Sequence, residues 1–291
     1  MNCVDQVIAD RYSIFNGDCV EVLQGLPAAS VDYSIFSPPF ASLYTYSNSP
    51  RDLGNCRNDA EFFAHFAHVI SGLRRVMKPG RNVSFHCMLM PTSKERDGHI
   101  GLRDFRGDLI RAFQAEGFIY ASEVCIWKDP VTAMQRTKAL GLLHKTVRGN
   151  AAMSRQGIPD YLVTMRAPGE APERVTHGAD YPVDKWQKVA SPIWMDIDPS
   201  DTLQYQSARE HDDERHICPL QLEVIRRGVD LWTNPNDIVL SPFMGIGSEG
   251  YVSLQMGRRF VGAELKESYY RQARENLAGC LAQADMFGAA A

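Results

Sequence analysis

Short hydrophobic runs alternate with longer amphipathic runs over the first 128 residues. The short runs are rich in β-branched and aromatic residues, as strands are, and they occupy 12–18, 31–36, 81–88 and 118–128. The longer runs repeat apolar residues at helical spacing and occupy 19–26, 58–80 and 103–118. Strands that alternate with helices predict a mostly parallel sheet with helices on both faces, an α/β fold of the Rossmann-like type.

This alternation breaks near residue 129 and returns near residue 216. The intervening region is polar and rich in Gly, Pro, Asp and Ser, apart from one strand-like run near 160–166. Regular order then resumes in helix-like and strand-like runs at 219–232, 237–243, 249–257, 258–265 and 267–279. We therefore expect one fold built from two halves, 1–128 and 216–291, with an irregular region at 129–215 between them.

The composition is that of an ordinary globular protein. The chain has 291 residues, of which 44% are hydrophobic and 23% charged. No run approaches the roughly 18 apolar residues that cross a bilayer, and the first residues lack the pattern of a signal peptide. The seven cysteines are scattered without a C-x-x-C pair, so we expect a reducing, cytoplasmic location and no bound metal.

The charge is negative overall but locally basic. The formal net charge of −4 argues against a wholly non-specific coat for nucleic acid. From 128 to 155, however, six Lys or Arg face a single acid, Asp129. A solvated surface is the plain interpretation of such a run. The alternative is contact with phosphates or guanine edges, for which the candidates are Arg136, Lys138, Lys145, Arg148 and Arg155.

A glycine motif lies in the C-terminal half. Gly245, Gly247 and Gly250 have the spacing G-x-G-x-x-G, and Glu264 follows Gly245 by 19 residues. This spacing is typical of a dinucleotide-binding site, in which the carboxylate binds a ribose. Only 27 residues follow Glu264, so the sheet must be completed by N-terminal strands. The negative charge of Glu249 would also oppose a pyrophosphate at the helix N-terminus. S-adenosylmethionine, with a ribose but no phosphate, is therefore favoured over NAD.

A second motif, Ser37-Pro38-Pro39-Phe40, directly follows the run 31–36. The two prolines predict a rigid loop at the carboxyl end of a parallel strand, where α/β active sites lie. The Ser37 side chain and the Pro38 carbonyl can both accept hydrogen bonds from one exocyclic amino group. These bonds favour a tetrahedral nitrogen aimed at an electrophilic methyl. Phe40 can stack on a flipped base, worth about 1–3 kcal/mol. A turn stiffened by proline, without chemistry, is the alternative.

These two motifs, in this order, resemble the circularly permuted β-class of bacterial and phage DNA amino-methyltransferases. The resemblance covers about 10–127 and 190–280 and implies catalysis in the first half, target recognition at 129–215 and cofactor binding in the last half. It implies that residues 37 to 40 are catalytic. The cofactor residues that it implies are Asp18 at the adenine, Glu264 at the ribose, Phe243, Gly245 and Gly247 at the turn, and His216 and Pro219 at the methionine end.

The cofactor turn departs from the common family form D-P-F-x-G-S-G-T-T. Ser241, Ser248 and Glu249 replace the Asp and both Thr, the glycines of the turn are kept, and Ser241 and Ser248 are expected at the methionine end. Tyr44 and Tyr46 follow the catalytic motif closely. They are expected to line the base pocket or fill the gap in the duplex, or else to pack the loop.

The resemblance implies transfer of a methyl from S-adenosylmethionine to the exocyclic amine of a flipped base in double-stranded DNA. Ser37 favours cytosine N4, whereas the abundance of adenine enzymes in the class favours adenine N6, and we place adenine narrowly first. A regulator that keeps the fold without transferring methyl is an alternative of another class. An enzyme acting on RNA or on a protein glutamine amide is a further one. We also expect association with the nucleoid and, as is common in the family, a homodimer.

Overall fold

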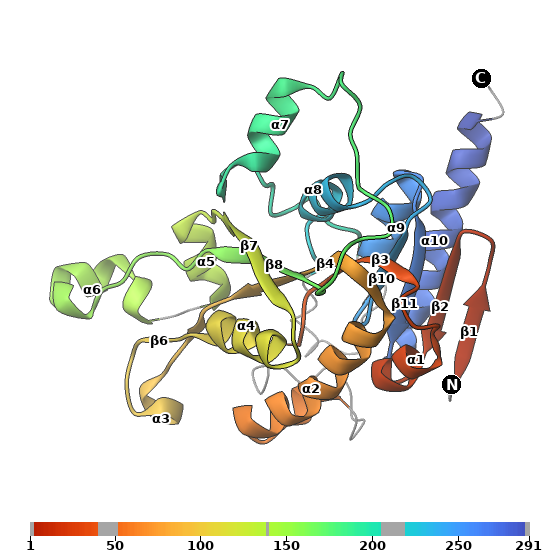
Figure 1. The fold of residues 1–291 in the computed structure, drawn as a ribbon. Helices are drawn as coiled ribbons and strands as arrows, with labels where there is room; N and C mark the ends of the chain where they lie inside the picture. Colours follow the sequence, from red (N-terminus) through yellow and green to blue (C-terminus); the bar gives the residue numbers. More distant parts are fainter. Residues whose placement is uncertain (1–2, 40–51, 138–139, 205–218, 289–291) are drawn as a thin grey trace.

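A mixed sheet of nine strands crosses the molecule in the computed structural model, which describes residues 3–39, 52–137, 140–204 and 219–288 (Figure 1). Its spatial order is β1-β2-β11-β10-β3-β4-β8-β7-β9. The strands are β1 (Asp5–Ile8), β2 (Tyr12–Asn16), β3 (Val31–Phe36), β4 (Met77–Met88), β7 (Ile119–Ile126), β8 (Asp160–Arg166), β9 (Ile193–Trp194), β10 (Ile238–Ser241) and β11 (Arg259–Glu264). A separate short pair is formed by β5 (Met90–Pro91) and β6 (Leu102–Arg103). The predicted α/β fold is confirmed.

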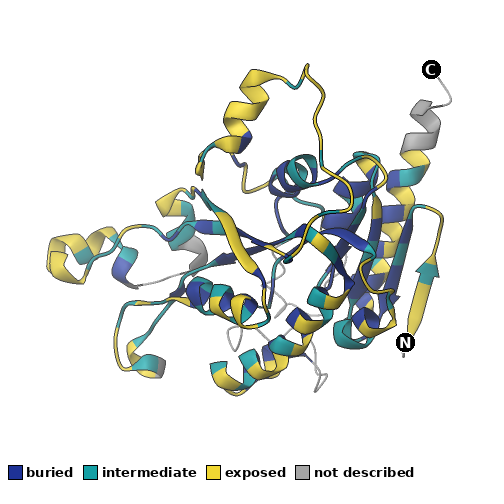
Figure 2. Cartoon of the chain, in the orientation of Figure 1, coloured by how far each residue is buried: buried dark blue, intermediate teal, exposed yellow. Residues whose placement is uncertain are grey.

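Helices cover both faces of this sheet. On one face lie α1 (Cys19–Gly25), α2 (Asp59–Val76) and α4 (Phe105–Ala115), and on the other lie α8 (Leu222–Trp232), α9 (Ser248–Gln255) and α10 (Glu267–Gly288). Side chains alternate along the strands between the two cores. Phe36 and Val83 belong to the first core, and Tyr33, Ile35 and Val239 belong to the second. Figure 2 shows the resulting buried centre beneath exposed outer surfaces.

Strands from the two ends of the chain interleave at the centre of the sheet. β10 and β11 lie between β2 and β3, and these four strands run parallel to one another and to β4. The C-terminal glycine motif therefore completes its sheet with N-terminal strands, as the sequence predicts. The chain passes from β10 through α9 to β11, which lies on one side of the β10–β3 pair. It passes from β3 through α2 to β4, which lies on the other side. β10 and β3 are thus neighbours whose connections diverge, the position at which open α/β sheets bind ligands.

Buried charges fasten these central strands at their amino ends. Asp32 Oδ1 lies 2.6 Å from Lys78 Nζ and 3.2 Å from Arg81 Nη2, and Arg81 Nη1 lies 3.3 Å from Asp237 Oδ2. The backbone N–H of Ile238 donates to Asp32 Oδ2 at 2.9 Å. Carboxylates and cations that neutralise one another in this way tie β3, β4 and β10 into one register, and breaking such a pair leaves an uncompensated buried charge.

The long helix begins as predicted but ends earlier. The Asn58 side chain caps α2 by accepting the backbone N–H of Glu61 at 2.9 Å. The sequence predicts that Pro79 and Gly80 end this helix, yet the helix ends at Val76, and β4 begins at once with Met77. Proline disfavours helical backbone in the residue before it, so the chain is already extended before Pro79 is reached.

The expected irregular region at 129–215 is only partly separate from the sheet. β8 pairs antiparallel with β4 and β7, and β9 pairs with β7. Its remaining described elements are α5 (Pro130–Thr137), α6 (His144–Gly149), α7 (Val183–Ala190) and the short 3-10 helices η3 (Leu140–Leu142) and η4 (Ala151–Met153). Two further short helices, α3 (Lys94–Asp97) and η2 (Leu53–Asn55), precede the region. The three predicted boundaries stay a prediction.

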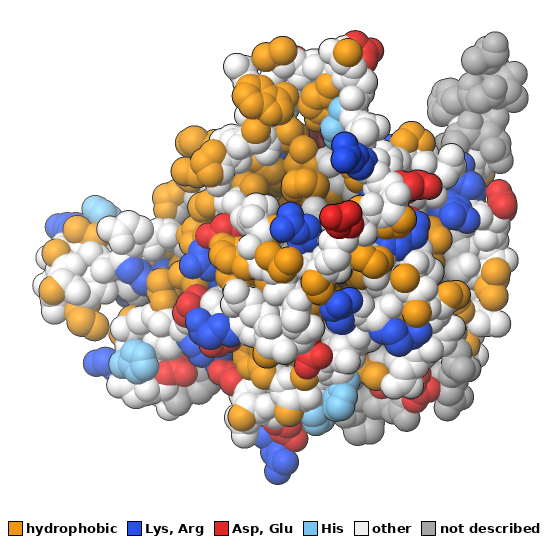
Figure 3. Space-filling model, viewed as in Figure 1, with side chains coloured by type: hydrophobic (Ala, Val, Ile, Leu, Met, Phe, Trp, Pro, Cys, Tyr) orange, Lys and Arg blue, Asp and Glu red, His pale blue; other side chains and the backbone are white. Residues whose placement is uncertain are grey.

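The surface of this region is apolar around α7. Figure 3 shows hydrophobic side chains gathered around α7 and over the sheet beneath it, while acidic and basic side chains on this face are interspersed. The large hydrophobic residues of this region that are exposed are Val131, Val147, Met153, Val183, Trp186, Ile193 and Met195. In the described chain, no helix is both long and apolar enough to cross a membrane.

Two helical glycines are expected to respond oppositely to alanine. A Cβ at Gly250 would lie 2.6 Å from Phe260 and 2.8 Å from Leu277, so Gly250→Ala should lower the free energy of unfolding by about 1–3 kcal/mol through overpacking. A Cβ at the exposed Gly279 meets nothing within 4 Å, so Gly279→Ala should raise it by up to about 1 kcal/mol. Urea unfolding measures both, and changes of the same sign would contradict this packing.

Candidate active site

The predicted motif residues that the structure describes gather along one edge of the sheet. Ser37 directly follows β3, and the glycine turn follows β10. Glu264 is the last residue of β11, and Asp18 lies just after β2. Because these strands are parallel, their carboxyl ends meet at the same edge. The two motifs, about two hundred residues apart in sequence, therefore follow adjacent strands.

The glycine turn is held against Glu264 by backbone hydrogen bonds. The N–H of Gly245 donates to Glu264 Oε2 at 2.9 Å, and the N–H of Lys266 donates to Oε1 at 2.8 Å. Gly245 and Gly247 have φ values of +53° and +86°, which favour glycine. Each carboxylate oxygen can accept a second hydrogen bond. The carboxyl group is thus fixed in position and retains acceptor capacity for a ligand.

Burial shifts the pKa values of two carboxyl groups in this turn. It raises the pKa of Glu264 to about 7, although backbone N–H groups of Lys266 and Gly245 oppose the shift. It raises the pKa of Glu249 to about 8, and the nearby Glu264 adds to that shift. Glu249 is therefore mostly protonated at neutral pH. The sequence argument that its negative charge opposes a pyrophosphate is wrong for this reason, since burial removes the charge.

The other predicted cofactor residues have defined surroundings. Asp18 caps α1 by accepting the N–H of Val20 at 2.8 Å. The half-buried Phe243 packs its ring 5.7 Å from that of Phe36. Ser241 is fully buried, and its Oγ has no hydrogen-bond partner within the described residues. Ser248 is also buried, whereas Pro219 is half-buried. Their roles toward a cofactor stay predictions.

Behind Ser37 lies a chain of polar side chains that the sequence did not reveal. Ser37 Oγ lies 3.2 Å from His86 Nδ1. His86 Nε2 lies 3.0 Å from Asp160 Oδ2, and Lys128 Nζ lies 2.5 Å from the same oxygen. His86 is near the carboxyl end of β4, Asp160 begins β8, and Lys128 follows β7. In the sequence, each of these residues is a polar residue at or near the end of an apolar strand. The pairing of β4, β8 and β7 in the fold is what brings the three together.

Two members of this chain, His86 and Asp160, are buried. His86 is 9% exposed and Asp160 is 2% exposed. Burial alone would raise the pKa of Asp160, but His86 and Lys128 outweigh it and hold that pKa below its ordinary value. Asp160 is therefore a carboxylate at neutral pH, with Lys128 as its counterion.

The predicted DNA contacts are only partly described. Lys145 and Arg148 are exposed on α6, and Arg155 is half-buried with its side chain against Gly141. Burial lowers the pKa of Arg155. Arg136 lies on α5. Other predicted residues lie outside the described residues, namely Phe40, Tyr44, Tyr46, Lys138 and His216.

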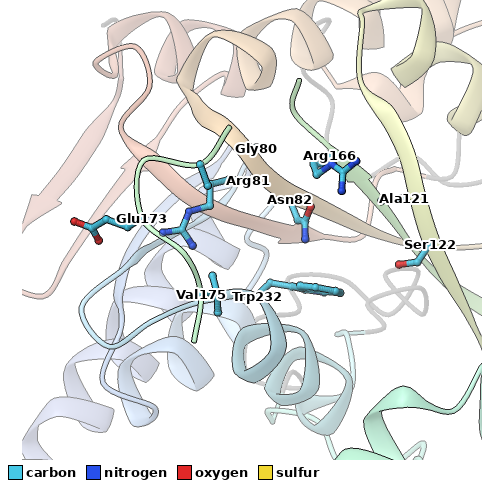
Figure 4. A pocket seen from close by; sticks show the side chains of 10 residues that line it. Gly80, Arg81, Asn82, Ala121, Ser122, Arg166, Glu173, Val175 and Trp232 are labelled. Atoms are coloured by element: carbon cyan, nitrogen blue, oxygen red, sulfur yellow. The ribbon is translucent and has the colours of Figure 1, made fainter. Parts of the chain in front are cut away.

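A cavity of about 360 Å³ lies at the opposite edge of the sheet (Figure 4). Arg81 and Asn82 line it from the amino end of β4, and Trp232 lines it from the end of α8. It is remote from Ser37 because it lies at the amino ends of the strands. Within the ranges that the structure describes, no group of three or more His, Cys, Asp or Glu side chains is arranged to hold a metal ion.

Comparison with known sequences finds one family over most of the chain. Residues 31–275 match the family model described as DNA methylase, N6_N4_Mtase. The chain is 26% identical over 268 residues to the type II methyltransferase M.BglII of Bacillus subtilis, covering 91% of this chain and 69% of that protein. It is 23% identical over 274 residues to the DNA adenine methyltransferase YhdJ of Escherichia coli K12, covering 91% and 82%.

Solved structures show the same fold. A candidate DNA modification methylase of Thermus thermophilus, complexed with S-adenosyl-L-methionine, superposes with a TM-score of 0.66 at 21% identity, covering 91% of this chain and 93% of that one. The PvuII DNA methyltransferase, titled cytosine-N4-specific, superposes with a TM-score of 0.67 at 18% identity, covering 94% and 90%. At these identities the likeness concerns the fold.

The buried Glu249 makes stability depend on pH. Its carboxyl has a pKa of about 8 when folded and an ordinary value of 4.5 when unfolded, so the folded state binds more protons between these values. The free energy of unfolding should therefore fall as pH rises from 4.5 to 8. Glu249→Gln removes this cost, so its melting temperature should exceed that of the wild type at pH 8, with the gain shrinking toward acid pH.

Thermal melts between about pH 5 and pH 8.5, which span most of the interval between the unfolded and folded pKa values, measure this dependence. The control is Glu275→Gln, which makes the same change at an exposed position of α10. Its melting curve should follow that of the wild type at every pH. A Glu249→Gln gain that is equal at all pH values would contradict a buried, titrating Glu249.

Proposed function

The chain belongs to the DNA methylase family of N6 and N4 amino-methyltransferases, which use S-adenosylmethionine, and we propose that it methylates an exocyclic amine of a base in double-stranded DNA at a fixed sequence. The target base is flipped out of the duplex, because its amino group is out of reach inside the helix. The observation that carries this proposal is the adjacency of β10 and β3, which brings the glycine turn next to Ser37.

The residues of the glycine turn fit S-adenosylmethionine. Glu264 retains acceptor capacity for the ribose hydroxyls, and the turn of Gly245 and Gly247 allows close backbone approach. The buried Ser241 hydroxyl has no hydrogen-bond partner among the described side chains and backbone, which suits a polar ligand group. Bound there, the cofactor supplies a methyl group on a positively charged sulfur.

Ser37 and the Pro38 carbonyl orient the target amine. An exocyclic amine is a weak nucleophile because its lone pair is delocalised into the ring. Two acceptors that hold its N–H bonds favour a tetrahedral nitrogen with the lone pair directed at the methyl. The rigid loop after β3 keeps both acceptors in place without a large rearrangement.

For the target base we propose cytosine N4. The family uses Ser at this motif frequently in cytosine enzymes and Asp usually in adenine enzymes. Here Ser37 is part of a built arrangement, since its Oγ lies 3.2 Å from His86 Nδ1, an atom that can accept a hydroxyl proton. The narrow preference for adenine rests on the abundance of adenine enzymes, which is no property of this chain. Adenine N6 is the second candidate, favoured by the similarity to YhdJ.

The exposed Lys145 and Arg148 on α6 are the described candidates for phosphate contact. They lie in the region between the two halves of the fold, where the family resemblance implies target recognition. Contacts to phosphates position a protein on the duplex without selecting sequence. The half-buried Arg155 packs on Gly141 and is better placed to support this segment than to reach a phosphate.

Glu264→Gln should weaken binding of S-adenosylmethionine. Above pH 7, where Glu264 is ionised, it replaces a carboxylate, which only accepts hydrogen bonds, with an amide whose NH2 would face a backbone N–H. Hydrogen bonds to charged groups contribute about 1.5–3 kcal/mol, so the dissociation constant should rise about 10- to 100-fold. Isothermal titration calorimetry measures it, with Glu275→Gln as the control. Wild-type affinity in Glu264→Gln would contradict the ribose assignment.

Ser37→Ala should slow methyl transfer by about 10²–10³-fold, because it removes one acceptor from the amine in the transition state. The assay is mass spectrometry of nucleosides from DNA incubated with protein and S-adenosylmethionine, which also identifies the methylated base. Ser122→Ala, at an exposed position near the opposite end of the sheet, should retain the wild-type rate. A wild-type rate in Ser37→Ala would remove this serine from the mechanism.

A further inference from the structure

We propose that His86, Asp160 and Lys128 form a chain behind Ser37 that directs its hydroxyl and takes up the proton released by the methylated amine. His86 acts through Ser37 and is in this sense a positioning residue and proton acceptor rather than a group that touches the base. The inference rests on the proposed function, since it concerns the fate of a proton in that reaction.

The first link is the contact between Ser37 and His86. Ser37 Oγ and His86 Nδ1 are 3.2 Å apart, a distance at which the hydroxyl donates if Nδ1 carries no proton. A hydroxyl that gives its proton to Nδ1 turns both oxygen lone pairs outward, where they can accept from an amine. Without an acceptor behind it, the Ser37 hydroxyl could point its own proton at the amine. The amine N–H would then lose one hydrogen-bond acceptor.

The second link decides which ring nitrogen carries the proton. His86 Nε2 is buried, and Asp160 Oδ2 lies 3.0 Å away. The geometry is that of an ion-pair contact rather than a straight hydrogen bond, and Nε2 has no other partner among the residues described. The negative charge of Asp160 beside Nε2 favours a proton on that nitrogen and leaves Nδ1 free to accept.

Lys128 keeps this carboxylate ionised. Its Nζ lies 2.5 Å from the oxygen of Asp160 that faces His86. Burial alone would favour the neutral form of Asp160. Its neighbours His86 and Lys128 outweigh burial and keep the pKa of this carboxyl below its ordinary value. A carboxylate is needed at this place, because a neutral acid could not stabilise an imidazolium ion that forms beside it.

The proton released in the reaction can be taken up by Ser37 and His86. The amine nitrogen forms its bond to the methyl carbon with its lone pair, and the electrons of the broken bond remain on the leaving sulfur. The nitrogen is then positively charged and gives one proton to Ser37 Oγ, while Ser37 gives its own proton to His86 Nδ1. His86 becomes an imidazolium ion against Asp160 and later releases its proton to solvent.

A purely structural role for the same residues makes different predictions. His86, Asp160 and Lys128 come from β4, from β8 and from the loop after β7, so they also brace these elements together. A brace is needed for folding and for binding at every pH. A proton acceptor is needed only in the transfer step, so its loss should leave the dissociation constants for DNA and cofactor unchanged.

The test compares His86→Asn with wild type in single-turnover methyl transfer at saturating DNA and cofactor. Asn keeps a short polar side chain that can accept the Ser37 hydroxyl but cannot take a proton. His68→Asn, the same change at an exposed position of α2, is the control. The groups facing His86 are Ser37, Asp160 and Lys128. Saturating cofactor keeps differences in cofactor binding from affecting the measured rate of transfer.

We expect His86→Asn to slow transfer by about 10²-fold or more, as for loss of general acid–base catalysis, with unchanged dissociation constants for cofactor and DNA. Asp160→Asn should also slow transfer, because it withdraws the carboxylate. His68→Asn should match the wild type throughout.

Three results would overturn the chain. Transfer by His86→Asn at the rate of the wild type would do so, as would transfer by Asp160→Asn at that rate. Slower transfer that is explained entirely by weaker binding of DNA or cofactor would show that these residues have a structural role alone. If instead the wild-type protein transfers methyl to no DNA, the proposed function itself fails, which is a distinct outcome.

Discussion

The parallel pairing of β10 with β3 is the constraint on which the site depends. Leu240 pairs with Ser34, and the Ser34 hydroxyl donates to the Leu240 carbonyl at 2.9 Å. Asp32 accepts the N–H of Ile238 at the amino end of the same pair. These bonds bring the C-terminal glycine turn beside the loop of Ser37, although the two lie at opposite ends of the chain. Chain order matters little once the strands interleave.

The same edge concentrates ionisable groups that burial penalises. Glu249 and Glu264 lie in the C-terminal half with pKa values raised to about 8 and 7, whereas Asp160 lies in the region between the two halves with its pKa held low. Of these three described carboxyl groups, Asp160 is the one with a Lys and a His within ion-pair distance. Perturbed groups of this kind cluster at functional sites, where stability is given up for chemistry. The opposite edge has charges too, but Asp32, Lys78 and Arg81 neutralise one another there.

Much of the fold could be predicted from the sequence because its signals are local. The Asn58 cap and the apolar spacing that follows it define α2, and the positive φ of Gly245 and Gly247 matches the turn that their spacing indicates. The end of α2 was misplaced because the effect of Pro79 reaches back along the chain. The members of the His86 chain were not found, because strand register and the antiparallel entry of β8 depend on tertiary pairing. The charge of Glu249 was wrong for a related reason, since a sequence does not show burial.

The reaction proposed for this sheet edge is transfer of a methyl group to an amino group in DNA. The decisive experiment is modification-sensitive long-read sequencing of DNA from cells with and without the protein. Methylated amino groups should occur in a fixed sequence context only when the protein is present, and we expect them on N4 of cytosine. Identical modification profiles in the two samples, from a protein that is folded and binds S-adenosylmethionine, would contradict it.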